Sequence, residues 1–170
     1  MKIKILLLVM VIIAGGLDLS AQSKNKLISD PETNQSVLIG YVDKTGLQKE
    51  EFGQYFNSQY EIYEVAEKNA EKLKSKMADV AVTIVLGTWC SDSKIQVPRF
   101  YKLLDAIKYP AANLTMIAVD SRKEALVVDV KQFDIERVPT FIFYRNGSEI
   151  GRIVESPKKS FEKDLWKIVR

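Results

Sequence analysis

Cys90, the single cysteine of this 170-residue chain, is the residue best suited to covalent chemistry. It lies in the segment Trp89-Cys90-Ser91-Asp92-Ser93, directly after an apolar run and directly before an amphipathic one. These neighbours predict a thiol at the junction of a strand and a helix, where free backbone N–H groups and the helix dipole favour the nucleophilic thiolate. Ser93 occupies the position at which a second cysteine would complete a dithiol pair. The motif therefore predicts a thiol without a resolving partner in the same chain.

The polar neighbours of Cys90 could support this thiol. Ser93 starts one helical turn later on the same face, so its hydroxyl could donate a hydrogen bond to the thiolate. Alternatively, a side chain from residues 91–93 caps the helix. The carboxylate of Asp92 suits a helix N-terminus, but its charge opposes the formation of a thiolate nearby, and Lys94 can offset it. A small buried core residue is the alternative for Cys90 itself.

Composition excludes several other chemistries. Histidine is absent, so a zinc, iron or copper site would need carboxylates alone, and a serine or cysteine hydrolase would lack its histidine base. The net charge is +3, and basic residues are scattered between acidic ones. Such a distribution disfavours a nucleic-acid partner. We therefore expect no metal, no cofactor and no nucleic acid.

Residues 1–21 are typical of an export signal. Lys2 and Lys4 precede an uninterrupted apolar run over 5–14, Gly15-Gly16 breaks it, and small residues offer a cleavage site near 20–23. An uncleaved membrane anchor is the alternative, but the run is shorter than the about 18 residues that a span usually needs. We expect a periplasmic or secreted protein without a membrane span after processing. A lone cysteine in such an oxidising compartment is either an intermolecular partner or a reactive thiol.

The first half of the mature chain predicts short elements. Residues 22–36 are rich in polar residues and predict a flexible lead-in. A short edge strand is expected at 37–42, a turn at 43–46 and a short helix at 49–56. From Ile62 to Met77 the apolar residues recur at helical spacing.

From residue 80 onward the pattern predicts alternating strands and helices. Strands are expected at 80–86, 114–119, 140–145 and 149–154, the last two joined by the hairpin signal Asn146-Gly147. Helices are expected after Cys90 with Pro98 inside, at about 122–133, and from Ser156-Pro157 to the end. This order predicts a mixed sheet with helices on both faces.

These motifs together resemble the thioredoxin family over about residues 60–170. In that family, a buried strand ends in Trp-Cys-x-x-Cys at a helix start, and a proline follows eight residues after the first cysteine. An apolar residue, a cis-proline and a threonine then precede a strand and an Asn-Gly or Asp-Gly hairpin. The matching segments here are Trp89-Cys90, Pro98, Val138-Pro139-Thr140, Phe141 to Arg145 and Asn146-Gly147. The resemblance implies an α/β thioredoxin fold over 37–170: a central mixed β-sheet flanked by helices, with an N-terminal extension before the core.

The resemblance also implies a substrate site opposite the thiol. The Val138–Pro139 bond would be cis and face Cys90, the backbone of Val138 would bind an extended substrate strand, and Thr140 would follow in the strand. An ordinary turn is the alternative for this segment. Trp89 would flank the groove, with core packing as its alternative. Three tyrosines could extend the groove or simply pack in the core or on the surface: Tyr55, Tyr60 and Tyr63.

Two departures from the family pattern change the expected chemistry. Ser93 replaces the second cysteine, and Ile84 stands six positions before Cys90, where the family often carries an acidic residue that helps to deprotonate the resolving thiol. The chain thus lacks both the resolving thiol and its base. We expect monothiol thiol–disulfide exchange of the isomerase or reductase kind, with thiol- or disulfide-containing polypeptides or small thiols as partners. The alternatives are a non-catalytic peptide-binding module and a thiol redox sensor.

Overall fold

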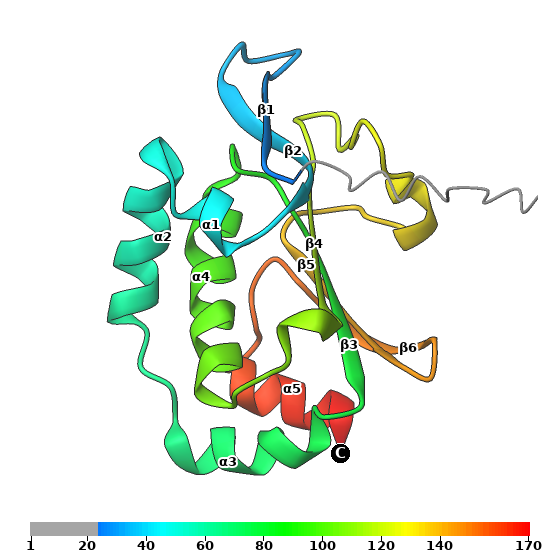
Figure 1. Cartoon of the computed structure of the whole chain (residues 1–170). Coiled ribbons are helices and arrows are strands. Elements are labelled where there is room, and N and C mark those ends of the chain that lie inside the picture. The colour runs from blue at the N-terminus through cyan, green and yellow to red at the C-terminus, as the bar shows by residue number, and fades with distance from the viewer. Residues whose placement is uncertain (1–23) are drawn as a thin grey trace, which may run out of the picture.

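Figure 1 shows the computed structural model, which describes residues 24–170; the predicted export signal lies outside the described residues. The strands are β1 (Lys26–Ser29), β2 (Ser36–Val42), β3 (Val80–Leu86), β4 (Leu114–Ala118), β5 (Thr140–Arg145) and β6 (Ser148–Val154). The helices are α1 (Lys44–Leu47), α2 (Glu50–Ile62), α3 (Glu67–Lys76), α4 (Ser91–Ala106) and α5 (Phe161–Val169), with 3-10 turns η1 (Ala111–Asn113) and η2 (Val130–Phe133). Within residues 24–170, no helix combines the length and apolarity that a membrane span requires.

The strands form one mixed sheet in the order β1-β2-β4-β3-β5-β6. β3 and β4 are parallel, and every other neighbouring pair is antiparallel. β3 lies in the interior of the sheet and is covered on both faces, since Ile84 and Val85 on opposite faces are each 0% exposed. The strand predicted at 80–86 is therefore confirmed, and it delivers the chain to Cys90 from the centre of the sheet.

The two faces of the sheet are covered differently. One face carries Ile84 and packs against α2, α3, α4 and α5, where the ring of Phe100 lies 4.8 Å from that of Phe141 and 5.1 Å from that of Phe161. The other face carries Val85 and is covered by the long segment between β4 and β5. Figure 1 shows this yellow segment on the side of the sheet away from the helices. The mixed sheet flanked by helices is as expected for the fold class, but the α-helices all lie on one face, so the expectation of helices on both faces is wrong.

The prediction of a helix at about 122–133 is wrong, because only the 3-10 turn η2 forms there. The side chain of Asp120 accepts hydrogen bonds from the N–H groups of Arg122 and Glu124, and Lys123 between them has a positive φ of 61°. Asp129 in turn caps η2, the 3-10 turn of this segment. Aspartate side chains that bond to nearby backbone N–H groups compete with a helix, so the segment forms turns despite its length.

The flexible lead-in expected at 22–36 is wrong over residues 26–29. These residues form β1, which pairs antiparallel with β2, so β2 is not the edge strand that the sequence suggested. The turn expected at 43–46 is the short helix α1, with the side chain of Asp43 accepting from the Gly46 N–H. The helix expected at 49–56 continues to Ile62, as α2.

The last helix begins later than its sequence signal indicated. Ser156-Pro157 was expected to open it, but Ser160 is the residue whose side chain accepts from the Lys163 N–H at the start of α5. The carboxylate of Asp164 holds the preceding loop through the N–H groups of Lys158 and Lys159. The Asn146-Gly147 hairpin, by contrast, joins β5 to β6 as predicted, and both of its residues have positive φ.

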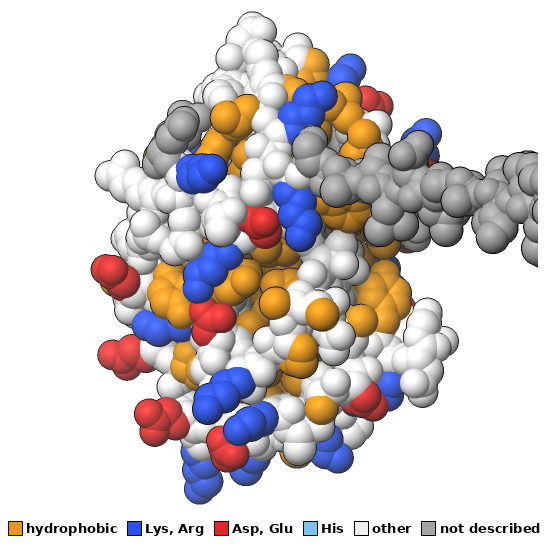
Figure 2. Space-filling model, in the orientation of Figure 1, with side chains coloured by type: hydrophobic (Ala, Val, Ile, Leu, Met, Phe, Trp, Pro, Cys, Tyr) orange, Lys and Arg blue, Asp and Glu red, His pale blue; other side chains and the backbone are white. Residues whose placement is uncertain are grey.

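The surface in Figure 2 carries charges of both signs. Lysine and arginine side chains are interspersed with aspartate and glutamate, and hydrophobic side chains show between them over the helices. The small net charge of the whole sequence, +3, agrees with this mixture. On this face the molecule therefore presents no extended field of a single sign.

Candidate functional site

Cys90 is the N-cap residue of α4, directly after the turn that leaves β3. Its backbone is extended (φ −79°, ψ 128°), its N–H donates to the Gly87 carbonyl over 3.0 Å, and its carbonyl accepts from the Lys94 N–H over 3.1 Å. The side chain is half-buried. The thiol thus lies at the strand-to-helix junction that the sequence predicted, at the positive end of the α4 dipole.

The segment before β5 lies against this thiol. The Sγ atom of Cys90 donates to the carbonyl oxygen of Val138 over 3.2 Å, and the Val138–Pro139 peptide bond is cis. Val138 and Pro139 are buried, and the hydroxyl of Thr140 donates to the Arg137 carbonyl over 2.6 Å. The structure therefore brings together Cys90 and the Val138-Pro139-Thr140 segment, which lie almost fifty residues apart in the sequence.

The backbone N–H of Val138 is one feature of this segment. It donates no hydrogen bond within residues 24–170, whereas the carbonyl of Pro139 accepts from the Glu155 N–H over 2.7 Å. A free N–H beside a cysteine can pair with the backbone of an extended polypeptide.

Ser93 does not form the hydrogen bond to the Cys90 sulfur that the sequence suggested. Its hydroxyl oxygen accepts from the Gly87 N–H over 3.2 Å, its side chain is 3% exposed, and it makes no hydrogen bond to Cys90. The expected bond to the thiolate is thus replaced by one that fixes the turn after β3. That turn N–H is buried, so it requires a partner, and Ser93 provides it.

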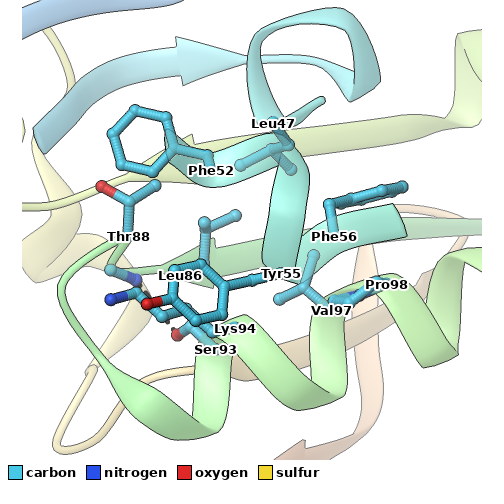
Figure 3. Close-up of a pocket in the computed structure, with 11 residues that line it drawn as sticks. Leu47, Phe52, Tyr55, Phe56, Leu86, Thr88, Ser93, Lys94, Val97 and Pro98 are labelled. Carbon is cyan, nitrogen blue, oxygen red and sulfur yellow. Dashed lines mark hydrogen bonds between the residues drawn. The ribbon is translucent and has the colours of Figure 1, made fainter. Parts of the chain in front are cut away.

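The N-terminal extension, residues 24–60, covers the face of α4 that carries Ser93. Figure 3 shows Ser93 and Val97 of α4 across a small pocket from Phe52 and Tyr55 of α2, with Leu47 of α1 at the upper end. The pocket measures about 30 Å³ and its lining is mainly apolar. The side chain of Ser93 therefore lies on the side of α4 that α1 and α2 cover.

Trp89 packs onto the face of the sheet opposite the helices. Its Nε1 donates to the carbonyl of Val119 over 3.0 Å, and its ring contacts the cluster that contains Val85 and Val138. A Cβ atom on Gly87 would lie 2.7 Å from the indole ring, so a side chain there would clash. The ring is half-buried and belongs to the residue directly before Cys90, so core packing accounts for part of its surface. Sequence reasoning missed Gly87, although a glycine between a buried strand and Trp-Cys is a signal for close approach.

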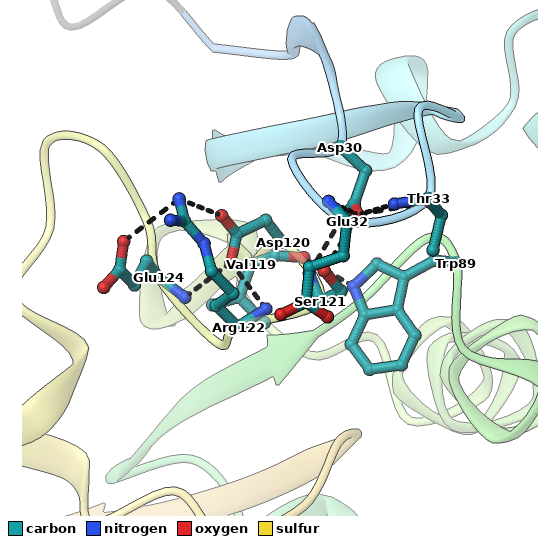
Figure 4. Close-up of polar contacts among 9 residues, drawn as sticks. All are labelled: Asp30, Glu32, Thr33, Trp89, Val119, Asp120, Ser121, Arg122 and Glu124. Carbon is teal, nitrogen blue, oxygen red and sulfur yellow. Dashed lines mark hydrogen bonds and ion pairs between the residues drawn. The ribbon is translucent and has the colours of Figure 1, made fainter.

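A buried carboxylate fixes the β1–β2 turn beside Trp89. Figure 4 shows Asp30 bonded to the N–H of Thr33 and to Ser121, which donates both its N–H and its hydroxyl over 2.8 Å. Burial alone would raise the pKa of Asp30, but the hydrogen bonds from Thr33, Ser121 and Glu32 outweigh it and hold the pKa well below its ordinary 3.8. Asp30 thereby ties the extension to the segment that follows β4.

Asp92 and Lys94 are not paired with each other. Within residues 24–170, the side chain of Asp92 forms neither a hydrogen bond nor an ion pair, and it is half-buried in the first turn of α4. The ammonium of Lys94 lies 4.7 Å from the ring centroid of Tyr55. Of the three tyrosines considered for the groove, Tyr55 therefore lies near the motif. Tyr60 and Tyr63 instead donate to Asp105 and Glu162.

Comparisons with known proteins agree on one family. The family profile described as Thioredoxin matches residues 61–167. Thioredoxin H5 of Oryza sativa subsp. japonica is 32% identical over 91 residues, which are 52% of this chain and 63% of that protein. Thioredoxin H9 of Arabidopsis thaliana is 29% identical over 90 residues, 53% of this chain and 60% of the relative. The chain thus spans less than two thirds of the length of these relatives.

A solved structure is similar at a lower level of identity. Thioredoxin O2 of Arabidopsis thaliana in its oxidised state is 20% identical, with a TM-score of 0.41, over 61% of this chain and 90% of that one.

Proposed function

Because the chain belongs to the thioredoxin family, we propose that it carries out thiol–disulfide exchange with Cys90 as its single reacting thiol. One observation carries the proposal: the Cys90 sulfur lies at the N-terminus of α4, 3.2 Å from the carbonyl oxygen of Val138, in the peptide before Pro139. This arrangement puts a half-buried sulfur next to backbone that can bind an extended chain. The partners are polypeptides with disulfides or thiols.

The first step makes a mixed disulfide. The Cys90 thiolate attacks one sulfur of a substrate disulfide, a new S–S bond forms, and the second substrate sulfur leaves as a thiolate that takes up a proton. The Val138 N–H, which has no partner within residues 24–170, supports this step because it can hold the substrate backbone beside the sulfur.

The second step needs a thiol from outside the chain. The sequence contains no second cysteine, and the hydroxyl of Ser93 cannot reduce a disulfide. An external thiolate must attack the substrate sulfur, so that the bond to Cys90 breaks and the Cys90 thiolate is regenerated. The exchange is balanced, because one disulfide is consumed and one is formed.

Labelling with a peptide disulfide tests this function. The native protein, incubated with a short fluorescent peptide that carries a disulfide, should gain one peptide per chain, and an added thiol should remove it. Cys90→Ser should gain none. A native protein that gains no peptide, while the unfolded protein does, would contradict the proposal and favour a peptide-binding module.

We propose in addition that the protein acts after export, in the periplasm or outside the cell. The basic, apolar and small residues over 1–21 support this location. Intact-mass analysis of protein recovered from its native compartment should give a chain that begins near residues 21–24. Recovery of a chain that still begins at Met1 would contradict export with cleavage.

A further inference from the structure

A polar pocket of about 300 Å³ lies between the N-terminal extension and the start of α4. One wall consists of Gln35, Ser36 and Gln54, which come from the β1–β2 turn, the first residue of β2 and helix α2. All three precede residue 61, where the match to the family profile begins. This wall is therefore an addition to the family core.

Another part of the lining belongs to the motif around the thiol. It consists of Thr88, Trp89 and Lys94, of which Trp89 directly precedes Cys90. The Lys94 N–H donates to the Cys90 carbonyl over 3.1 Å, so the two residues lie one helical turn apart. Cys90 itself does not line the pocket, but both of these lining residues are joined to it, Trp89 through the chain and Lys94 through this bond. The pocket thus adjoins the segment that presents Cys90.

The pocket offers one cation among neutral hydrogen-bonding groups and aromatic rings. Among the described residues that line it, Lys94 alone is charged, and its ammonium rests over the ring of Tyr55 on the same pocket. The ion pairs found among the described side chains are all formed by other cations. A carboxylate that entered the pocket would gain a charge-assisted bond from Lys94, and amide groups would find partners in Gln35 and Gln54.

The volume limits what can occupy this pocket. At about 300 Å³ it is at the small end of ligand pockets, which suits a molecule of a few amino-acid units better than a long polypeptide segment. A small acidic, peptide-like molecule therefore matches its size, its cation and its amide groups.

We infer that this pocket binds the external thiol that releases Cys90, and that this thiol is a small peptide-like molecule with a carboxylate. The inference rests on the proposed function, since it identifies the thiol of the second step. The bound thiolate attacks the substrate sulfur, the S–S bond to Cys90 breaks, and Cys90 leaves as a thiolate. The small thiol and the substrate part as a new disulfide, with no further oxidant or reductant.

Release kinetics test the inference with reduced glutathione as the probe. Cys90 is first loaded with a fluorescent cysteine peptide as a mixed disulfide, and release is followed by intact mass. The rate with glutathione should saturate with concentration and exceed the rate with glutathione diethyl ester, which has the same thiol without carboxylates. Because Lys94 is partly exposed, we expect a preference of about two- to fivefold.

Variants of the pocket assign that preference to Lys94. Lys94→Gln should reduce the ratio of the two rates to about one, and Lys94→Arg should restore it. Lys163→Gln is the matched control, because it removes an exposed lysine from α5, which borders a different groove. An effect of Lys94 on the Cys90 sulfur itself changes both rates equally and cancels in their ratio. In the Lys163→Gln control, the ratio of the two rates should be unchanged.

Three results would overturn the inference: no preference in the native protein, the same preference in Lys94→Gln, or an equal loss in Lys163→Gln. Each would mean that an external thiol reaches Cys90 without using the pocket. A peptide that never attaches to Cys90 would instead contradict the proposed function itself, so the two failures are distinguishable.

Discussion

Gly87 and Ser93 shape the turn that presents Cys90. The Gly87 N–H bonds to the Ser93 hydroxyl, and the absence of a side chain on Gly87 lets the Trp89 ring lie against the backbone. Trp89 is then held at its far end by the Val119 carbonyl. The first two contacts are local to the turn and the third reaches the chain just after β4, and together they set the direction in which the thiol leaves the sheet.

Gly87→Ala should displace Trp89 and destabilise the protein. The added Cβ would lie 2.7 Å from the indole ring, so the ring must move and lose its bond to Val119. We expect a loss of about 1–3 kcal/mol in the free energy of unfolding and altered Trp89 fluorescence, measured in a Trp166→Phe background. Gly147→Ala is the control: its positive φ strains a distant turn, so stability should fall while the Trp89 signal stays unchanged. Unchanged fluorescence in Gly87→Ala would contradict the assigned contact.

At the scale of residues, the sequence predicted where residues lie in the fold better than it predicted their hydrogen-bond partners. Cys90 lies at the start of a helix, and Val138 and Pro139 lie opposite it, as the motifs implied. The bond of Ser93 was not predictable, because a serine in the first helical turn can point toward the thiol or back to a backbone N–H. Which one it meets depends on the turn at Gly87, and a residue pattern does not specify that geometry.

At the scale of elements, the β1–β2 hairpin shows why polar composition misled the sequence analysis. Residues 22–36 resemble a solvated linker because they are rich in polar side chains. In the fold, however, the carboxylate of Asp30 is 0% exposed and accepts bonds from the turn and from Ser121. Composition alone does not separate polar groups that face water from those that are buried and satisfied.

Asp30→Asn should weaken the hairpin and change the acid sensitivity of the fold. The folded pKa of Asp30 lies below its ordinary 3.8, so its ionised form contributes stability at neutral pH that is lost as the pH falls below about 4. The asparagine variant should lose about 1–3 kcal/mol at pH 7, where an amide nitrogen replaces an acceptor. Its unfolding free energy should depend less on pH between 4 and 3.

Urea unfolding at neutral and acid pH measures this effect. Asp79→Asn is the control, because it removes an exposed ion pair with Arg145 and should cost less than about 1 kcal/mol. Equal losses in the two variants at pH 7 would contradict a stabilising role for the buried carboxylate.

At the scale of the whole molecule, the extension is part of the core. Leu38 of β2, Leu47 of α1 and Phe56 of α2 are buried in the same cluster as Ile84 and Phe100. The resemblance to the family predicted the mixed sheet and the site over 60–170. It did not predict how earlier residues dock, because the family pattern holds no information on elements outside its own core.

A chain that begins at residue 61, where the family match starts, should fail to fold cooperatively. It would lose the side chains of Leu38, Leu47 and Phe56 and expose the apolar surface that they cover on α4 and the sheet. Thermal unfolding followed by circular dichroism measures this. A chain that begins at residue 24 is the control, and its stability should equal that of the full chain. A cooperative transition of native stability in the shorter chain would contradict this account of the core.

The lifetime of a mixed disulfide on Cys90 tests the monothiol mechanism most directly. A labelled peptide is attached to Cys90, free thiols are removed, and the adduct is followed by intact mass in the native protein, in Ser93→Cys and in the control Ser91→Cys. We predict that the adduct persists in the native protein and in Ser91→Cys, whose Cα lies only about 3.8 Å from that of Cys90, too close for an ordinary disulfide. Ser93→Cys should release the peptide and form an internal disulfide once its side chain turns from the Gly87 N–H toward Cys90, because residues three apart on a helical turn are neighbours. An adduct that decays in the native protein as fast as in Ser93→Cys would contradict the mechanism.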